Sequence, residues 1–395
     1  MIFIKQGYKQ TKVGIIPEDW KVVKLNDIFT KSFYGTSESM NEIGKYPVLR
    51  MGNMQNGTLI INDLVYIDLE EKEFKKYQLK KGDILLNRTN SYELVGKISL
   101  FDFDEDFISA SYIVAYRPNQ KILNSIFINN LLNTTYFQEK IKTLATKGVS
   151  QANINPTSFK EVIKIPLPPL KEQEKIAEIL TTWDEAIALH VKLIEEKEQL
   201  KIGLMQKLLS GEVRFEGFCD EWNVFSLNEV LKERKTYQSK GLELEHVSLT
   251  KEGVVAKSER YERDFLVKAE DKQYKITKLN DICYNPANLK FGVICKNSYG
   301  DGIFSPIYVT FESKKGFNVD FLGCFLTWHD FIKKVRKYEE GTVYERMAVN
   351  PKDFLSFKTK LPSFLEQQKI AEVLSLADDE LNLCQAKRRS RQFLM

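Results

Sequence analysis

The stretches PPLKEQEKIAEIL, at residues 168–180, and PSFLEQQKIAEVL, at residues 362–374, are two copies of one sequence. Their shared E-Q-x-K-I-A-E core recurs 194 positions apart in a chain of 395 residues. An offset of about half the chain indicates duplication of one large unit and excludes a solenoid of many short repeats.

The duplication extends upstream of these stretches. Asn155-Pro156 matches Asn350-Pro351, Lys81–Ile84 resembles Leu279–Ile282, and Trp20 resembles Trp222. The copies agree least over about 30–75 and 232–270. Two copies with similar flanking sequences and different middle segments predict one architecture that presents two different recognition surfaces.

Each shared stretch opens a predicted long helix. The prolines within Ile165–Pro169 exclude helix interior, whereas Lys171–Leu209 has no Pro and one Gly, at position 203. Its apolar residues follow a heptad seam, and so do those after Ile370. We expect the two helices to pair antiparallel, against the alternative that each packs on its own domain. The predicted pairing residues are Ile176, Ile179, Leu180, Trp183, Ile187, His190, Leu193, Ile370, Val373, Leu374, Ala377, Leu381 and Cys384.

The rest of each half mixes short β-rich runs with helical ones. Ile84–Leu86, Ile98–Leu100 and Tyr112–Tyr116 have strand composition, whereas Ile126–Leu144 and Leu322–Val335 have helical patterns. The expected fold class is α+β, with two similar globular domains and a pair of long antiparallel coiled-coil helices in a pseudo-twofold repeat. The expected boundaries are 1–165 for the first domain, 166–215 for the first helical region, 216–359 for the second domain and 360–395 for a shorter second helical region.

Composition excludes several classes of protein. Hydrophobic residues make up 43% and charged residues 28%, as in globular chains, and no apolar run is long enough to span a bilayer. The five cysteines form no C-x-x-C pair, which favours the reducing cytoplasm over a disulfide framework or a zinc ribbon. The net charge is +4, but Pro166–Gly211 carries six Lys and eight Asp or Glu, which leaves +6 on the remainder. This net charge does not prove nucleic-acid binding; if the chain binds DNA, the acidic helical region is the part least suited to contact it.

The sequence gives little support to an enzyme. The best match to the D/N-P-P-Y/F loop of amino-methyltransferases, Asn285–Asn288, lacks the second proline and the aromatic residue, and its counterpart, Asn87–Asn90, has no proline. Gly96-Lys97 lacks the remainder of a P-loop. His190, His246 and His329 lie far apart, and no nucleophile signature is present. We interpret the chain as a binding protein that holds no metal and no cofactor.

Several motifs together resemble the specificity subunits of type I restriction–modification systems. They are I-P-x-D/E-W at Ile16–Trp20, G-D-I-L at Gly82–Leu85, K-G-V-S-Q-A-N-I-N-P at Lys147–Pro156, I-P-L-P-P-L-x-E-Q-x-K-I-A-E-I-L at Ile165–Leu180, and G-L-M-Q-K-L-L-S-G-E-V-R-F at Gly203–Phe215. The resemblance covers essentially the whole chain, and the repeat at half-length spacing is typical of the family. One departure is that the second helical region stops at Met395, before a second Q-K-L-L-x-G-like end.

The resemblance implies a non-catalytic subunit with two target-recognition domains. Each would read one part of a split DNA sequence in the major groove, and the paired helices would act as a ruler between them. Two modification subunits would supply S-adenosylmethionine binding and adenine methylation. Restriction subunits, which translocate and cleave DNA with ATP and Mg²⁺, would join the complex. A subunit of a related restriction class that cuts near its site, a coiled-coil scaffold that binds proteins, and a stand-alone DNA enzyme are the alternatives.

Candidate DNA contacts are polar and basic residues in expected loops, because direct readout and phosphate binding use these side chains. Arg88 and Arg346 are the predicted guanine readers, whereas Gly82-Asp83 and Asn280-Asp281 are predicted structural turns. The candidate contacts are Tyr34, Gly35, Thr36, Ser37, Arg50, Asn53, Arg88, Thr89, Asn90, Lys147, Ser150, Gln151, Lys235, Thr236, Tyr237, Gln238, Asn288, Lys290, Thr342, Tyr344 and Arg346.

Overall fold

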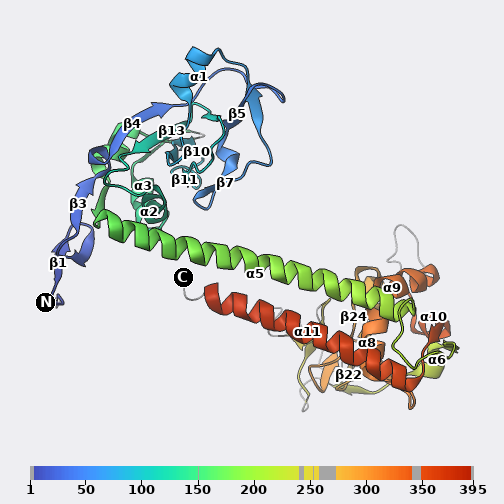
Figure 1. Ribbon diagram of the computed structural model, residues 1–395. Helices are drawn as coiled ribbons and strands as arrows, with labels where there is room; N and C mark the ends of the chain where they lie inside the picture. The colour runs from blue at the N-terminus through green and yellow to red at the C-terminus, as the bar shows by residue number, and fades with distance from the viewer. Residues whose placement is uncertain are drawn as a thin grey trace. The chain divides into compact units, whose positions relative to one another are not determined.

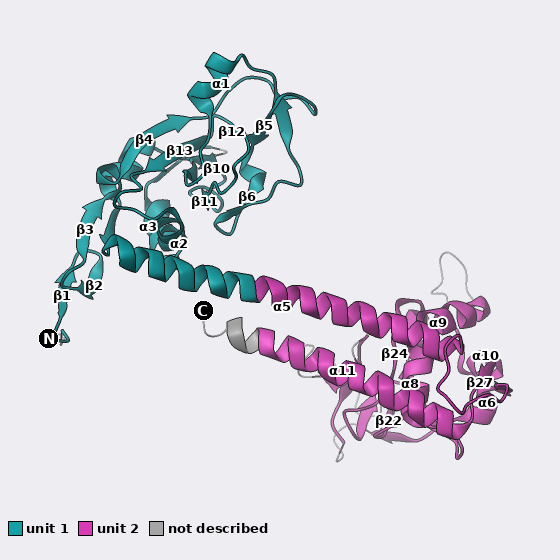
Figure 2. Ribbon diagram, viewed as in Figure 1, with its two compact units in different colours: residues 1–186 teal, residues 187–395 magenta. Residues whose placement is uncertain are grey.

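The computed structural model describes residues 4–149, 151–239, 244–251, 253–257, 273–339 and 348–392. The chain divides into two compact units, residues 1–186 and 187–395 (Figure 2). The division falls inside the longest helix, α5 (Leu170–Ser210), so each unit contains part of that helix (Figure 1). The candidate contacts Ser150, Thr342, Tyr344 and Arg346 lie outside the described residues.

The first unit is built on a four-stranded antiparallel sheet in the order β11-β9-β13-β4. Helices cover its apolar face and share a core with the start of α5, where Ala177 is 3% exposed. The strands are β4 (Phe29–Tyr34), β9 (Ile84–Asn87), β11 (Ile98–Leu100) and β13 (Ile113–Pro118). The helices are α2 (Ser125–Leu132), α3 (Thr135–Thr143) and α4 (Pro156–Val162).

Smaller sheets complete the first unit. Three-stranded sheets have the orders β12-β5-β8 and β10-β15-β14, and two-stranded ones pair β1 with β2, β3 with β16, and β6 with β7. The strands are β1 (Tyr8–Thr11), β2 (Gly14–Pro17), β3 (Lys21–Lys24), β5 (Tyr46–Leu49), β6 (Met54–Gln55), β7 (Thr58–Leu59), β8 (Val65–Ile67), β10 (Thr89–Asn90), β12 (Ile108–Ser109), β14 (Ala145–Lys147), β15 (Ala152–Ile154) and β16 (Lys164–Leu167). The short helices are η1 (Leu25–Asp27), η2 (Met51–Asn53) and α1 (Glu71–Tyr77).

The second unit repeats the central sheet in the same strand order, β24-β23-β26-β18. Its other sheets are β19-β22-β25, β20-β21 and β17-β27. The strands are β17 (Asn223–Ser226), β18 (Leu231–Glu233), β19 (Tyr237–Ser239), β20 (Val247–Leu249), β21 (Val254–Ala256), β22 (Gln273–Thr277), β23 (Ile282–Tyr284), β24 (Ile294–Lys296), β25 (Gly302–Phe304), β26 (Val309–Ser313) and β27 (Lys358–Leu361). The helices are α6 (Leu227–Val230), η4 (Pro286–Phe291), α8 (Val319–Thr327), α9 (His329–Val335), η5 (Arg336–Tyr338), α10 (Pro351–Ser356) and α11 (Phe364–Gln392).

The matched residues of the repeat perform matched structural tasks, and the expected α+β duplication is confirmed. Asn155 and Asn350 each cap a helix with proline in its first turn, by accepting two backbone N–H bonds. The predicted turns at Gly82 and Asn280 both have positive φ, +94° and +68°. In each turn the aspartate that follows accepts a backbone N–H three residues earlier, from Lys80 or Lys278, at 2.8 Å.

The shared glutamine locks each long helix to its own domain. Gln173 is fully buried; its Oε1 accepts the N–H of Asn124, which caps α2, and its Nε2 donates to the carbonyl oxygens of Ile122 and Pro168. Gln367 repeats this with the N–H of Asn318, which caps α8, and the carbonyl of Pro362. The best-matched stretch of the sequence is therefore the joint between long helix and domain.

Within the second unit the end of α5 and α11 run antiparallel. Lys197 pairs with Glu380 at 2.6 Å, Lys201 pairs with Asp378, and His190 Nε2 lies 2.8 Å from the carbonyl oxygen of Cys384. The residue numbers of the partners on α11 thus decrease as those on α5 increase. This confirms the predicted antiparallel pair for this part of the helices.

Three predictions about the elements were wrong in detail. Ile126–Leu144 forms two helices, because Asn133 and Thr134 interrupt it, and Leu322–Val335 is likewise broken at Trp328. The strand expected at Tyr112–Tyr116 is β13, which starts one residue later and continues to Pro118. Each break lies at a helix cap, which the spacing of apolar residues does not predict.

The five thiols should differ in reactivity in the folded chain. Cys219 is exposed, whereas burial raises the pKa of Cys295 to about 12 and that of Cys324 to about 11. A three-unit rise lowers the thiolate fraction roughly 1,000-fold. At pH 8 we expect a thiol-reactive dye to label Cys219 first and Cys295 and Cys324 only slowly, until denaturant exposes them.

The same pKa shifts predict alkaline destabilisation. In the unfolded chain these two thiols ionise near pH 9, while the folded chain still holds them protonated, so stability falls as pH rises from about 9 towards 12. Rapid labelling of Cys295 in folded protein at pH 8 would contradict this account.

Candidate nucleic-acid interface

A small sheet in the first unit assembles several of the predicted contact residues. β10 pairs with β15, and β15 with β14, so that Thr89 and Thr146 both lie opposite Asn153, and Lys147 lies opposite Ala152. Arg88 is fixed at the edge of this sheet, because its N–H donates to Tyr112 and its carbonyl accepts from Ile154. Residues about 60 positions apart in sequence therefore share one surface.

The guanidinium of Arg88 is held by its neighbours. It lies over the ring of Tyr34, 5.5 Å from the centroid. Its Nη2 donates to Asn153 Oδ1 at 3.3 Å, and Thr89 Oγ1 donates to the same oxygen at 2.5 Å. Its Nε is enclosed without a hydrogen-bond partner among the described residues. Tyr34 is 48% exposed, so a cation and an aromatic ring meet at the surface here.

Lys147 adds a second cation–aromatic pair to the same sheet. Its Nζ lies 4.0 Å from the centre of the Tyr92 ring, and Tyr92 is 37% exposed. The turn that follows is closed by a bond from the Gly148 N–H to the carbonyl of Gln151, whose side chain is exposed. Asn90 is half-buried, and its side-chain oxygen accepts the N–H of Ser91.

Three predicted contacts belong to the framework of the first unit. A Cβ on Gly35 would lie 1.8 Å from the carbonyl oxygen of Ser109, so this position requires glycine for a close backbone approach. Thr36 is 1% exposed and Asn53 is 4% exposed, and the Asn53 amide bonds to the backbone of Arg50, Ile60 and Asp63. Gly35, Thr36 and Asn53 therefore maintain the structure of the unit, and we do not propose that they contact DNA.

Two further predicted contacts in the first unit have accessible side chains. Ser37 is exposed. Arg50 is half-buried and pairs with the exposed Asp63 at 2.9 Å, so DNA phosphates would have to compete with that carboxylate.

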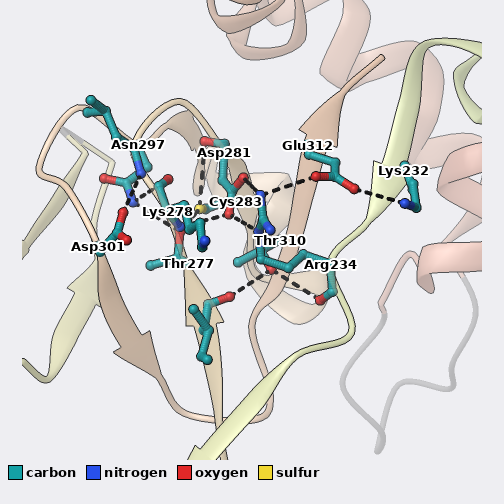
Figure 3. Close-up of polar contacts among 12 residues, drawn as sticks. Lys232, Arg234, Thr277, Lys278, Asp281, Cys283, Asn297, Asp301, Thr310 and Glu312 are labelled. Atoms are coloured by element: carbon teal, nitrogen blue, oxygen red, sulfur yellow. Dashed lines mark hydrogen bonds and ion pairs between the residues drawn. The ribbon is translucent and has the colours of Figure 1, made fainter. Parts of the chain in front are cut away.

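The second unit carries a polar network beneath its candidate loop, shown in Figure 3. Arg234 binds Asp281 through two bonds, at 2.8 and 2.9 Å, and Glu312 at 3.3 Å. Asn297 donates to Thr277 and to the carbonyls of Lys278 and Gly300. Asp281 is 1% exposed, so this arginine is anchored in the domain.

The anchored arginine positions the segment that follows it. Lys235, Thr236 and Tyr237 are exposed, and Tyr237 begins β19. Gln238 is half-buried, and its Nε2 is enclosed without a bond among the described residues. Farther along the chain, Asn288 is half-buried within η4, and Lys290 lies over the Phe291 ring at 5.1 Å. The predicted residues of this unit are thus arranged differently from those of the first.

The predicted helix-pairing residues divide between two tasks. Ile176 packs against the core of the first unit, and Ile370, Val373 and Leu374 pack in the core of the second. These four residues therefore follow the alternative expectation, in which each helix packs on its own domain. His190 contacts Cys384, and Ile187, Ala377 and Leu381 are half-buried. The set with exposed side chains comprises Ile179 at 54%, Leu180 at 38%, Trp183 at 48% and Leu193 at 39%.

Of the neighbours Leu193 and Ile194, Ile194 is the buried residue, at 6% exposure, whereas Leu193 is 39% exposed. An α-helix has 3.6 residues per turn and drifts from a strict seven-residue repeat, so the buried face moves by a residue along a long helix.

Sequence reasoning missed Tyr92 and Asn153, which complete the Arg88 surface, and Gln173 with Gln367, which lock the helices. The shared E-Q dipeptide was the available signal for the glutamines. Nothing local marks Asn153, whose partners lie 64 and 65 residues away in sequence. Across the described ranges, no group of three or more His, Cys, Asp or Glu is placed to hold a metal ion. No helix in those ranges is both long and apolar enough to cross a membrane.

Comparison with known proteins finds similarity over about half of the chain. The family model described as the type I restriction modification DNA specificity domain matches residues 17–199. The MjaX specificity subunit of Methanocaldococcus jannaschii is 35% identical over 215 residues, which cover 53% of this chain and 50% of that protein. The type I restriction enzyme EcoKI specificity subunit of Escherichia coli K12 is 27% identical over 233 residues, 57% of this chain and 49% of that protein. The chain thus spans about half the length of the curated relatives it matches.

Solved structures extend the likeness over the whole fold. The S subunit of a type I restriction–modification system from M. genitalium has a TM-score of 0.55, 18% identity, and coverage of 95% of this chain and 93% of its own. The HsdS subunit of Thermoanaerobacter tengcongensis has a TM-score of 0.51, 16% identity, and coverage of 94% and 92%. Residues 17–199 therefore match the family model of the type I restriction modification DNA specificity domain, and the fold of the chain is similar to that of the solved specificity subunits.

Proposed function

We propose that this chain is the DNA-specificity subunit of a type I restriction–modification complex, in which each unit reads one half of a bipartite sequence. The observation that carries the proposal is the match of residues 17–199 to the specificity domain, joined to a second unit with the same central strand order. Equal frames with different surface residues suit a target whose two halves differ in sequence.

In this proposal the chain recognises DNA and its partners perform the chemistry. Two modification subunits bind S-adenosylmethionine and methylate adenine, and restriction subunits supply ATP- and Mg²⁺-dependent translocation and cleavage. The long helix α5 offers these partners apolar side chains at its surface, with Leu189 69% and Ile202 56% exposed. Exposed apolar residues in such number on one helix favour a protein contact.

The test is co-expression with a modification subunit in a host that lacks its own adenine methylation, followed by methylation-sensitive sequencing. The expected result is one asymmetric motif of two short blocks, with a methylated adenine in each block on opposite strands. A complex that assembles with an active modification subunit and methylates no motif would overturn the proposal.

Exchange of one recognition surface should change half of the motif. If residues 20–150 are replaced by the corresponding segment of another specificity subunit, α4, α5 and the whole second unit stay unchanged, and the recognition surface of the first unit is exchanged. We expect one block of the methylated motif to change and the other to stay the same. Loss of both blocks in a complex that still assembles would argue against independent reading.

The exposed face of α5 also supports a second candidate, a coiled-coil scaffold whose domains bind proteins. The two candidates differ in their response to salt. Specific DNA binding by the complex should weaken steeply between roughly 50 and 200 mM salt because counterions are released. Absence of DNA binding at any salt concentration would favour the scaffold.

A further inference from the structure

We propose that the first unit recognises a guanine in its half-site through Arg88, with Asn153 beside it as a donor-only partner and Tyr34 as the support for the guanidinium. This inference rests on the proposed function and assigns a base to one of its two recognition surfaces. It follows from the orientation of one side-chain amide.

The orientation of the Asn153 amide is fixed by its partners. An arginine guanidinium can only donate hydrogen bonds, so the Asn153 atom that faces Arg88 Nη2 at 3.3 Å must be the oxygen. The Thr89 hydroxyl donates to the same oxygen at 2.5 Å. The remaining polar atom of the amide, Nδ2, carries two donors, and the exposed Asn153 side chain can present them outward.

The side chain of Arg88 is prepared to present its outer edge. Its Nε is enclosed, and its Nη2 is turned towards Asn153, whereas Nη1 forms no hydrogen bond with the described residues and is not enclosed. The backbone is held on both sides by Tyr112 and Ile154, and the ring of Tyr34 lies beneath the guanidinium. A preorganised fork loses less conformational entropy when it binds.

The chemistry of this edge matches guanine and excludes adenine. Guanine presents two acceptors in the major groove, N7 and O6, and an arginine fork binds both. Adenine presents an acceptor and a donor, and asparagine reads it only when both its oxygen and its nitrogen are free. Since the Asn153 oxygen is already occupied, the Arg88–Asn153 pair offers donors alone.

The residues that the structure describes in the second unit do not form this edge. By strand register, Ile84 corresponds to Ile282, so Arg88 corresponds to Pro286 and Thr89 to Ala287, neither of which has a side-chain donor. Asn87 corresponds to Asn285, whose side chain caps η4 instead. The guanine is therefore assigned to the block that the first unit reads.

The proposal is tested in the complex with its modification subunit, by methylation sequencing of wild type, Arg88→Lys, Arg88→Ala and Asn153→Asp. The wild-type motif should contain a G·C pair in the block that the first unit reads. Arg88→Lys keeps the charge but loses the fork, so the preference at that base pair should fall roughly 5- to 150-fold, the range of one bidentate contact. The other block should keep its sequence.

Asn153→Asp still binds Arg88 but removes the two outward donors and adds acceptors, so it should also reduce methylation of the wild-type motif. Lys75→Ala, on α1, removes one exposed charge that pairs with Glu71 and serves as the control, which should leave the motif unchanged. Thermal unfolding of each complex separates a folding defect from a change of specificity.

Each contrary result has a separate meaning. If the Arg88 variants lower methylation equally at all sites and keep the motif, Arg88 contacts phosphate and the proposal is overturned. A wild-type motif without a G·C pair in the block of the first unit also overturns it and leaves the specificity function intact. Absence of any motif in wild type would instead remove the proposed function itself.

Discussion

Arg214→Ala is expected to lower the free energy of unfolding of the second unit, and by clearly more than the loss of an exposed ion pair would. Arg214 donates from Nε and Nη2 to the two oxygens of Glu366, both at 2.8 Å, and Glu366 is 1% exposed. The pair joins the segment after α5 to the first turn of α11. Loss of the guanidinium leaves a buried carboxylate without its counter-charge, and this uncompensated burial accounts for the size of the effect.

The repeat supplies a matched control for this prediction. At the equivalent position of the first unit, Glu172 is exposed and accepts one bond, from Trp20 Nε1 at 3.0 Å. Trp20→Phe should therefore cost about 1 kcal/mol. Urea unfolding of both variants, monitored by circular dichroism, provides the comparison. Equal costs for Arg214→Ala and Trp20→Phe would show that burial of the Glu366 carboxylate does not determine its sensitivity.

This contrast shows what the sequence could and could not predict. Glu172 and Glu366 belong to the strongest internal match, and that match predicted the duplication and both long helices. It placed the start of the first within one residue of Leu170, whereas the second begins at Phe364, six residues before the expected pattern at Ile370. It could not show that Glu366 is buried against Arg214 while Glu172 stays exposed. Burial depends on partners from other parts of the chain, and the residues preceding Trp20 and Trp222 differ between the copies.

The candidate site was predictable to the extent that its chemistry is local. Arg88 and Thr89 follow a recognisable strand and turn, and the structure places both at the surface of the small sheet. Asn53 is also a polar residue of a type that contacts DNA, but its side chain is buried and forms three hydrogen bonds with the backbone. A polar residue in a loop can cap the backbone as readily as it can bind a ligand, and only the fold distinguishes the two.

The two units also neutralise an equivalent buried aspartate with arginines from different strands. Asp83 and Asp281 occupy the same turn, and each binds an arginine through two bonds. In the first unit the arginine is Arg117, on β13, and in the second it is Arg234, directly after β18. The arginines that bind the equivalent buried aspartates therefore come from two different, neighbouring strands of the central sheet.

Strand register defines which residues correspond. Tyr116 pairs with Ile84 and Phe311 with Ile282, which places Arg117 in the position of Glu312. Across the neighbouring pair of strands, Ser32 corresponds to Glu233, and hence Phe33 to Arg234. In the first unit the Arg117 guanidinium lies 5.5 Å from the centre of the Phe33 ring, so both arrangements place an arginine over the same part of the sheet.

Arg234→Phe alone is expected to destabilise the second unit by about 3–5 kcal/mol, because the Asp281 carboxylate, 2% exposed, loses its guanidinium. Adding Glu312→Arg recreates the residues of the first unit, Phe33 and Arg117, and should restore most of that loss. A double-mutant cycle measured by urea unfolding gives the coupling, expected to be about 1–3 kcal/mol in the restoring direction.

The control for this cycle is Lys232→Ala, since Lys232 is 69% exposed and pairs with Glu312 at 3.3 Å without reaching the buried aspartate. It should change stability by no more than about 0.5 kcal/mol. If Glu312→Arg adds its own destabilisation to that of Arg234→Phe, the two arrangements are not interchangeable. Restoration would show that the frame requires a guanidinium at this carboxylate and accepts it from either strand, which leaves the segment after Arg234 free to differ between the two units.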